Sequence, residues 1–262
     1  MTHMKKLAVV LTSCAVTLGG VLLSSSAEAR SADRLVVTEG GTPDDPKVYS
    51  GDGAAVDGIT VEADNVIVED YVAEQPEAPG VEIFGDNVTI QNVTVTDPQG
   101  GDGDGVRFFG DDLKILNNTI RGTDNDNGHA DCMQTFSDDT PPSQNVLIEG
   151  NRCEQIDNMC LMAEGPNDGE GDGVGHSSDF TIRNNFCETL EASQHLMIED
   201  VQDVVIADNE FAGPTYRAIG LAINSTGAHV GGSTLNPDIE CEVGIDESSM
   251  DGYEGPEPGC EP

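Results

Sequence analysis

Residues 87–95 read NVTIQNVTV, and residues 112–120 read DLKILNNTI. In both stretches aliphatic residues alternate with polar ones, which predicts a short strand with one buried face. Related copies begin at Asn65, Asn145, Asp179 and Asp203. Successive copies lie 22, 25, 33, 34 and 24 residues apart. A constant strand with insertions of variable length indicates a solenoid, in which coils stack and loops grow on one side.

One position of the repeat carries a recurring asparagine, at Asn118, Asn151, Asn185 and Asn209. Stacked side-chain amides can hydrogen-bond from one strand to the next, so we expect a ladder of asparagines. The alternative is that each asparagine only ends its strand with a turn. Both interpretations require a repeat.

A second strand follows most copies, as in DGVRFF, DCMQTF, MCLMAE and QHLMIE, and more loosely in AIGLAI. Alternation within these strands separates inward from outward side chains. The expected inward residues are Val106, Met133, Leu161 and Leu196, each followed two positions later by Phe108, Thr135, Ala163 and Ile198. The expected outward residues are Arg107, Gln134, Met162 and Met197.

The same alignment predicts disulfides. Cys132 and Cys160 occupy one position of consecutive coils, and Cys153 and Cys187 occupy another. Parallel strands lie about 4.8 Å apart, within the Cα separation of about 4.4–6.8 Å that a disulfide tolerates. We therefore pair Cys132 with Cys160 and Cys153 with Cys187. The remaining Cys241 and Cys260 would close the acidic C-terminal tail, and the alternative is that the stacked cysteines stay reduced.

The N-terminus has the pattern of a secretory signal. Lys5 and Lys6 precede a short apolar run, and the sequence Ala-Glu-Ala ending at Ala29 offers a cleavage site. We expect residues 1–29 to be removed, leaving one secreted, extracellular domain over residues 30–262 with an irregular tail from about residue 225. The apolar run is too short to predict a membrane span, and we expect a monomer.

The charge is strongly negative, with 11 basic and 49 acidic residues and a net charge of −38. No basic patch exists to attract nucleic acid. The acidic residues are spread along the chain, which is typical of a solvated surface in a salt-adapted protein, or of calcium ligands. Such a charge destabilises a folded chain unless salt or cations screen it.

The repeats NVTIQNVTV, DLKILNNTI, DFTIRNNFC and DVVIADNEF resemble those of the pectate-lyase-like superfamily of right-handed parallel β-helices. The resemblance covers roughly residues 35–223. It implies an all-β, right-handed parallel β-helix with loop insertions and a disulfide-tied C-terminal tail. It also implies an extracellular polysaccharide as substrate, bound in a groove across the outward face of one sheet.

On that face the stretch NGHADCMQTF, residues 127–136, carries polar residues that the repeat does not require. We expect catalytic roles for His129, Asp131, Gln134 and Arg107. We expect substrate contacts from Glu164, His195 and Arg217.

Two reactions fit these residues. β-Elimination on a uronic acid has three requirements. It needs a group that neutralises the carboxylate, which Arg107, Gln134 or calcium would supply. It also needs a base for the C5 proton, which His129 or an arginine would supply, and an acid for the leaving oxygen. Hydrolysis needs two carboxylates, for which Asp104 and Asp131 are candidates. The set of polygalacturonase motifs does not occur in the right order, and the Arg-x-Pro motif of pectate lyases is absent. We expect a polysaccharide lyase; the alternatives are a glycoside hydrolase and a non-catalytic protein that binds glycan or a surface.

Calcium is the expected metal. The stretches GGDGDGV and NDGEGDGVG offer flexible oxygen ligands. The first candidate ligands are Asp102, Asp104 and Asp131. Histidine and cysteine lack the close spacing of a zinc site.

Overall fold

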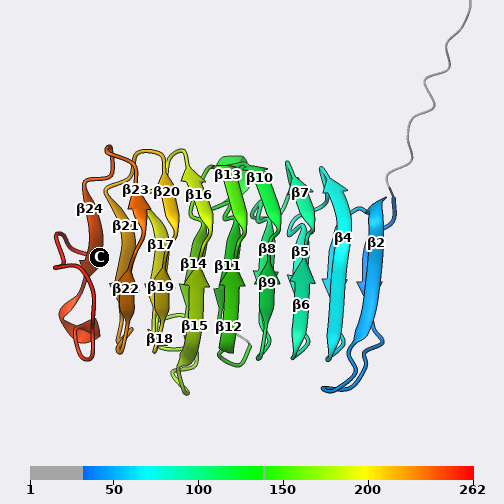
Figure 1. Ribbon diagram of the computed structural model, residues 1–262, viewed down its shortest axis with the longest axis horizontal. Coiled ribbons are helices and arrows are strands. Elements are labelled where there is room, and N and C mark those ends of the chain that lie inside the picture. The colour runs from blue at the N-terminus through cyan, green and yellow to red at the C-terminus, as the bar shows by residue number, and fades with distance from the viewer. Residues whose placement is uncertain (1–31, 138–139) are drawn as a thin grey trace, which may run out of the picture. The chain divides into compact units, whose positions relative to one another are not determined.

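The alternating stretches form strands that pair in parallel. The computed structural model describes residues 32–137 and 140–262, so the predicted signal peptide lies outside the described residues. Every pairing between named strands in this part of the chain is parallel. Figure 1 shows the strands side by side in successive coils, from β2 to β24. The predicted parallel β-helix is confirmed.

Each complete coil contributes a strand to the first of three faces, a nine-stranded sheet. This face comprises β1 (Leu35–Val37), β3 (Ile59–Val61), β5 (Val81–Ile83), β8 (Val106–Phe108), β11 (Met133–Phe136), β14 (Leu161–Glu164), β17 (Gln194–Glu199), β21 (Arg217–Ala222) and β24 (Cys241–Ile245).

The other two faces belong to one 15-stranded sheet that is folded at β4 (Val66–Glu74) and its partner β2 (Lys47–Ala55). The first half of β4 pairs with the second face, and its last residues pair with the third. The second face comprises β6 (Val88–Gln91), β9 (Lys114–Leu116), β12 (Gln144–Glu149), β15 (Ser177–Arg183), β18 (Val201–Gln202), β19 (Val205–Ala207) and β22 (His229–Gly231). The third face comprises β7 (Thr94–Thr96), β10 (Thr119–Thr123), β13 (Arg152–Ile156), β16 (Phe186–Thr189), β20 (Glu210–Ala212) and β23 (Thr234–Leu235).

The regular coils extend further than we predicted. Strands β22, β23 and β24 continue all three faces to Ile245, where an irregular tail from about residue 225 was expected. Only two 3₁₀ turns occur in the described residues, η1 (Asn125–Asn127) and η2 (Glu247–Ser249). None of the described helices is long and apolar enough to span a membrane.

The interior is a stack of aliphatic side chains, in which each fully buried isoleucine or leucine stabilises the fold by about 1.5–3 kcal/mol. All eight residues predicted to point inward from the first face are buried. The register matches the alignment, since Met133 pairs with Val106 and Leu161, and Leu161 with Leu196.

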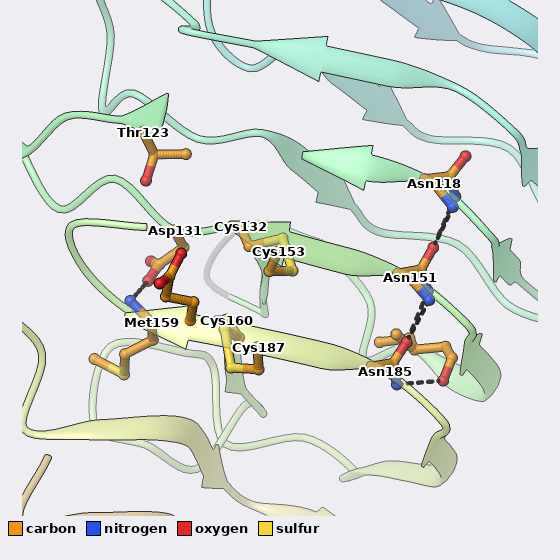
Figure 2. Close-up of a disulfide and its surroundings, with 12 residues drawn as sticks. Asn118, Thr123, Asp131, Cys132, Asn151, Cys153, Met159, Cys160, Asn185 and Cys187 are labelled. Carbon is orange, nitrogen blue, oxygen red and sulfur yellow. Dashed lines mark hydrogen bonds between the residues drawn. A yellow bond between two sulfur atoms is a disulfide. The ribbon is translucent and has the colours of Figure 1, made fainter. Parts of the chain in front are cut away.

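The asparagine ladder is confirmed. The Nδ2 atom of Asn118 donates to Oδ1 of Asn151, Asn151 donates in the same way to Asn185, and Asn185 to Asn209, at 3.0, 3.1 and 3.0 Å. Figure 2 shows the first part of this ladder. The turn is made by the preceding residue, because Asn117 and Asn184 have φ of 53° and 56°, in the left-handed region that asparagine tolerates.

Two predicted disulfide pairings are wrong. Cys132 bonds to Cys153 and Cys160 to Cys187, each with a Cα separation of 5.9 Å (Figure 2). The stacking itself was right, since Cys153 and Cys187 are register partners. Stacked side chains point the same way, however. Cys132, just before β11, instead meets Cys153 on β13 of the same coil. The predicted bond between Cys241 and Cys260 is confirmed.

Candidate functional site

The predicted outward column of the first face is confirmed. Arg107, Gln134, Met162 and Met197 are register partners on β8, β11, β14 and β17. Arg107 and both methionines are partly exposed between buried neighbours. Gln134 is only 3% exposed, and its Oε1 atom has no hydrogen-bond partner among the described residues.

A groove of about 250 Å³ lies over the middle of this column, at Gln134 and Met162. One wall comes from the loop before β11, which carries His129, and the other from the loop between β14 and β15. The lining residues are Asp102, His129, Gln134, Phe136, Met162, Glu164, Asp168 and Glu170. A larger hollow on the second face, of about 350 Å³, is lined by a single carboxylate, Asp112, which accepts from Asn145. Of these two hollows, the groove is the one that gathers a histidine and several carboxylates.

His129 is positioned against a buried carboxylate. Its Nδ1 atom lies 3.6 Å from Oδ2 of Asp131, whose side chain is fully buried while that of His129 is 51% exposed. The other oxygen of Asp131 accepts from the backbone N–H of Met159 at 2.8 Å (Figure 2). It also accepts from the side-chain amide of Asn158 at 3.0 Å. The Oδ2 atom has no hydrogen bond within the described residues, so it is free to interact with the imidazole.

The pKa values of His129 and Asp131 both differ from their ordinary values. The interaction with Asp131 raises the pKa of His129 to about 9, against the opposing effect of burial. Burial raises the pKa of Asp131 to about 6, although His129 opposes the rise. Between these values His129 is an imidazolium next to a carboxylate, which suits it to donate a proton.

Glu164, at the end of β14, also has a raised pKa. Burial raises its pKa to about 7, helped by repulsion from Asp168, Glu199 and Glu170, while His129 lowers it. Glu199 is its register partner on β17, and burial raises the pKa of that group too. Glu164 therefore exchanges a proton near neutrality.

Arg107 forms ion pairs with two carboxylates. Its guanidinium contacts Asp104 closely and lies 3.0 Å from Asp102. Burial alone would lower the pKa of Arg107, but the two carboxylates raise it. Burial raises the pKa of Asp104, which is fully buried. Arg107 thus supports the groove and is not free to neutralise a uronate.

The three predicted calcium ligands do not converge on one point. Asp104 binds Arg107 and accepts the backbone N–H of Asp131 at 2.9 Å, and Asp131 turns to His129 and Met159. Within residues 32–137 and 140–262, no trio of His, Cys, Asp or Glu is arranged to hold a metal ion. Calcium binding stays a prediction.

Of the three predicted substrate contacts, only Glu164 lines the groove. The assignment of His195 is wrong: it is fully buried, lies 2.7 Å from the carbonyl of Ala212 and packs on Phe211. It is the second residue of β17, in the position that Cys160 occupies one coil earlier, and both side chains are buried. Arg217 lies outside the groove and donates to Gln194 at 2.7 Å.

Sequence reasoning missed Phe136, Asp168 and Glu170 as groove residues. Phe136 could have been found, because it stands two positions after Gln134 and so points outward. Asp168 and Glu170 lie in a loop whose path the strand pattern does not define.

No protein-family model matches the chain, and no curated protein matches it. Among solved structures, it is similar to a mutant tailspike protein of E. coli bacteriophage HK620 in complex with pentasaccharide, with 12% identity over 86% of this chain and a TM-score of 0.48. It is also similar to the A-module of an Azotobacter vinelandii mannuronan C-5 epimerase, with 9% identity over 76% of this chain and a TM-score of 0.37. A third is the catalytic domain of a GH87 α-1,3-glucanase in complex with nigerose, with 11% identity over 80% and a TM-score of 0.34. The match covers 54%, 60% and 59% of those chains, and these values describe a distant likeness of fold.

Proposed function

We propose that the protein is an extracellular enzyme that cleaves a polysaccharide in this groove by general acid–base catalysis. The observation that carries the proposal is that Glu164 and His129 line the same groove with pKa values of about 7 and 9. The pKa of Glu164 is displaced to neutrality by burial, and that of His129 is raised by its carboxylate partner Asp131. Groups in a cleft whose pKa values are strongly perturbed are candidates for catalytic acids and bases. The three disulfides favour an oxidising, extracellular setting.

The leading reaction is β-elimination on a uronate. Above its pKa of about 7, the Glu164 carboxylate takes the C5 proton, and the C4–O bond breaks as a C4=C5 double bond forms. Below its pKa of about 9, the His129 imidazolium gives its proton to the leaving oxygen. These roles reverse the expectation that His129 is the base, because its contact with Asp131 keeps it protonated. We assign to the side-chain amide of Gln134, which also lines the groove, a hydrogen bond to the substrate carboxylate.

The electrostatics of the groove set a condition on this reaction. Asp102, Asp168 and Glu170 also line it and would repel a uronate. Molar salt, with a screening length of about 3 Å, removes most of that repulsion. Bridging calcium would do the same, which keeps the predicted cofactor in the proposal.

The test is to incubate the full protein with sodium alginate or polygalacturonate at low and high salt, and to follow the ultraviolet absorbance of the unsaturated product. Glu164→Gln should lower turnover by about 100-fold or more. Glu210→Gln, on the exposed third face, is the matched control and should leave turnover unchanged. Equal turnover in wild type and Glu164→Gln would refute the assignment of the base.

Hydrolysis is the second candidate, and the register pairing of Glu164 with Glu199 favours it. Adjacent strands about 4.8 Å apart place two carboxylates near the separation that glycosidases use. The pair expected from the sequence, Asp104 and Asp131, is fully buried and does not reach substrate. Hydrolysis would release reducing ends without ultraviolet absorbance, and would be fastest below pH 7, where Glu164 is protonated. Binding without either product would indicate the non-catalytic alternative.

A further inference from the structure

Three phenylalanines form a second column on the outward face. The chain has seven phenylalanines, and Phe108, Phe180 and Phe211 are in the core. Phe84 follows β5, Phe109 follows β8 and Phe136 ends β11, and the pairing of these strands aligns the three residues. Phe84 is 46% exposed. Three of the four phenylalanines outside the core therefore share one column of one face.

This column leads into the groove. Phe136 lines the groove, and its register partner on the next strand is Glu164, followed by Glu199. A ligand that extends from Glu164 toward the N-terminal coils therefore meets Phe136, then Phe109, then Phe84. Strands about 4.8 Å apart give the three rings a span of about 10 Å, close to two sugar residues of an extended polysaccharide.

The rings form a stepped apolar surface. The centroids of Phe84 and Phe109 are 5.5 Å apart with their planes at 17°. Phe136 is 4.9 Å from Phe109 and turned by 81°. Some of the exposed surface of the column is therefore ring edge, while Phe136 presents a differently oriented surface inside the groove.

Polar groups border this strip. The neighbouring column carries Arg107 and Gln134, and the buried Oε1 atom of Gln134 has no partner among the described residues. At the turn that follows the phenylalanines, Oδ1 of Asp86 accepts the backbone N–H of Asp111 at 2.9 Å. A narrow apolar strip between hydrogen-bonding groups suits a sugar, whose C–H faces are apolar and whose hydroxyls lie at the rim. A protein partner would need a broader contact area.

We propose that Phe84, Phe109 and Phe136 form a binding platform for two pyranose residues of the glycan, on the N-terminal side of Glu164. The position relative to the cleaved bond depends on the proposed function, whereas the binding itself does not.

The test uses affinity electrophoresis in native gels that contain sodium alginate, polygalacturonate or laminarin, with Glu164→Gln as the parent so that the polymer is not consumed. Adding Phe84→Ala should weaken the affinity for the retarding polymer by about 3- to 10-fold. Phe84→Leu, which keeps the apolar volume but loses the ring, should weaken it nearly as much. The matched control is Phe186→Ala on the third face, where Arg152 stacks 4.0 Å from the ring, and it should leave retardation unchanged.

Unchanged retardation of Phe84→Ala, an equal effect of Phe186→Ala, or no retardation in any of the three gels would overturn the platform. A Phe84→Ala variant that alters only the sedimentation of the protein would overturn it in favour of self-association. Phe84-dependent binding without turnover in the active chain would support the platform while refuting the proposed catalysis. Turnover with a KM that Phe84→Ala leaves unchanged would support the proposed catalysis while refuting the platform.

Discussion

Two histidine–aspartate pairs stand beside the strands of the first face, and they differ in how the carboxylate is used. His129 and Asp131 precede β11, whereas Asp200 follows β17 and bonds to His176. In both pairs the aspartate is fully buried and the histidine side chain is about half exposed, at 51% and 41%. Residue types and burial alone would give them the same role.

The hydrogen bonds separate them. Asp200 uses both oxygens: Oδ1 lies 2.5 Å from Nδ1 of His176, and Oδ2 accepts from the backbone N–H and the amide of Asn167 at 2.8 and 2.7 Å. It therefore fastens the loop that carries Asp168 and Glu170 into the groove. Asp131 leaves Oδ2 without a hydrogen bond to any described residue, facing a histidine that lines the groove. The Asp200 carboxylate, with both oxygens hydrogen-bonded, stabilises the structure. The Asp131 carboxylate keeps one oxygen available for catalysis.

The largest expected effect is on the first pair. Asp131→Asn keeps the Oδ1 acceptor for Met159 but removes the charge beside His129, so the pKa of His129 should fall toward its ordinary value. Turnover should fall by about 100-fold or more, and His129→Ala should abolish it with little change in thermal unfolding. Steady-state assays and NMR titration of the histidines measure both results. A His129→Ala variant that unfolds at lower temperature yet keeps its turnover would show that the site is wrong.

The second pair should behave in the opposite way. Asp200→Asn places an amide against the donors of Asn167, which leaves buried groups unsatisfied at a cost of about 1–3 kcal/mol. We expect the Tm to fall by about 3–10 °C and turnover to fall by less than about tenfold. Calorimetry with parallel assays measures this. A loss of turnover as large as that of Asp131→Asn, at unchanged Tm, would remove the distinction between the pairs.

The smallest expected effect is on the pH dependence of stability. The folded-state pKa values of Asp131, Glu164 and His129 are all raised, to about 6, 7 and 9. The folded state therefore binds these protons more tightly than the unfolded chain, and that stabilisation is lost as pH rises through each value. Tm should decline by a few degrees between about pH 4.5 and 9, and Glu164→Gln should flatten the part below pH 7. A Tm that rises over this range at fixed salt would contradict these shifts.

The fold could be predicted because alternation and the recurring asparagine are local and repeated. The inward and outward positions of β8, β11, β14 and β17 followed directly. Contacts between different faces of one coil could not be predicted in this way, because the alignment compares each coil only with other coils. For this reason Cys132 was assigned to its stacked neighbour, and His195 was placed outside although its side chain is buried.

The site was predictable only in part. The positions of Gln134 and Glu164 on the first face follow from register, and the groove contains both. The ion pair between Arg107 and Asp102 depends on the path of the loop that carries Asp102. The pKa of Glu164 depends on burial and on Asp168 and Glu170, whose loop has no repeat pattern. Insertions between strands thus determine the charge of the groove while the coil determines its position.

The disulfides also determine how the chain would respond to force. Because Cys132–Cys153 and Cys160–Cys187 each lie within one coil, they do not link neighbouring coils covalently. Coils pulled from one end should peel off in sequence, but the residues enclosed by each bond stay out of the extended length. The bonded cysteines are 21 and 27 residues apart in the sequence. The disulfides would therefore keep segments with contour lengths of about 70 Å and 90 Å from extending. After reduction, single-molecule traces should show this additional length.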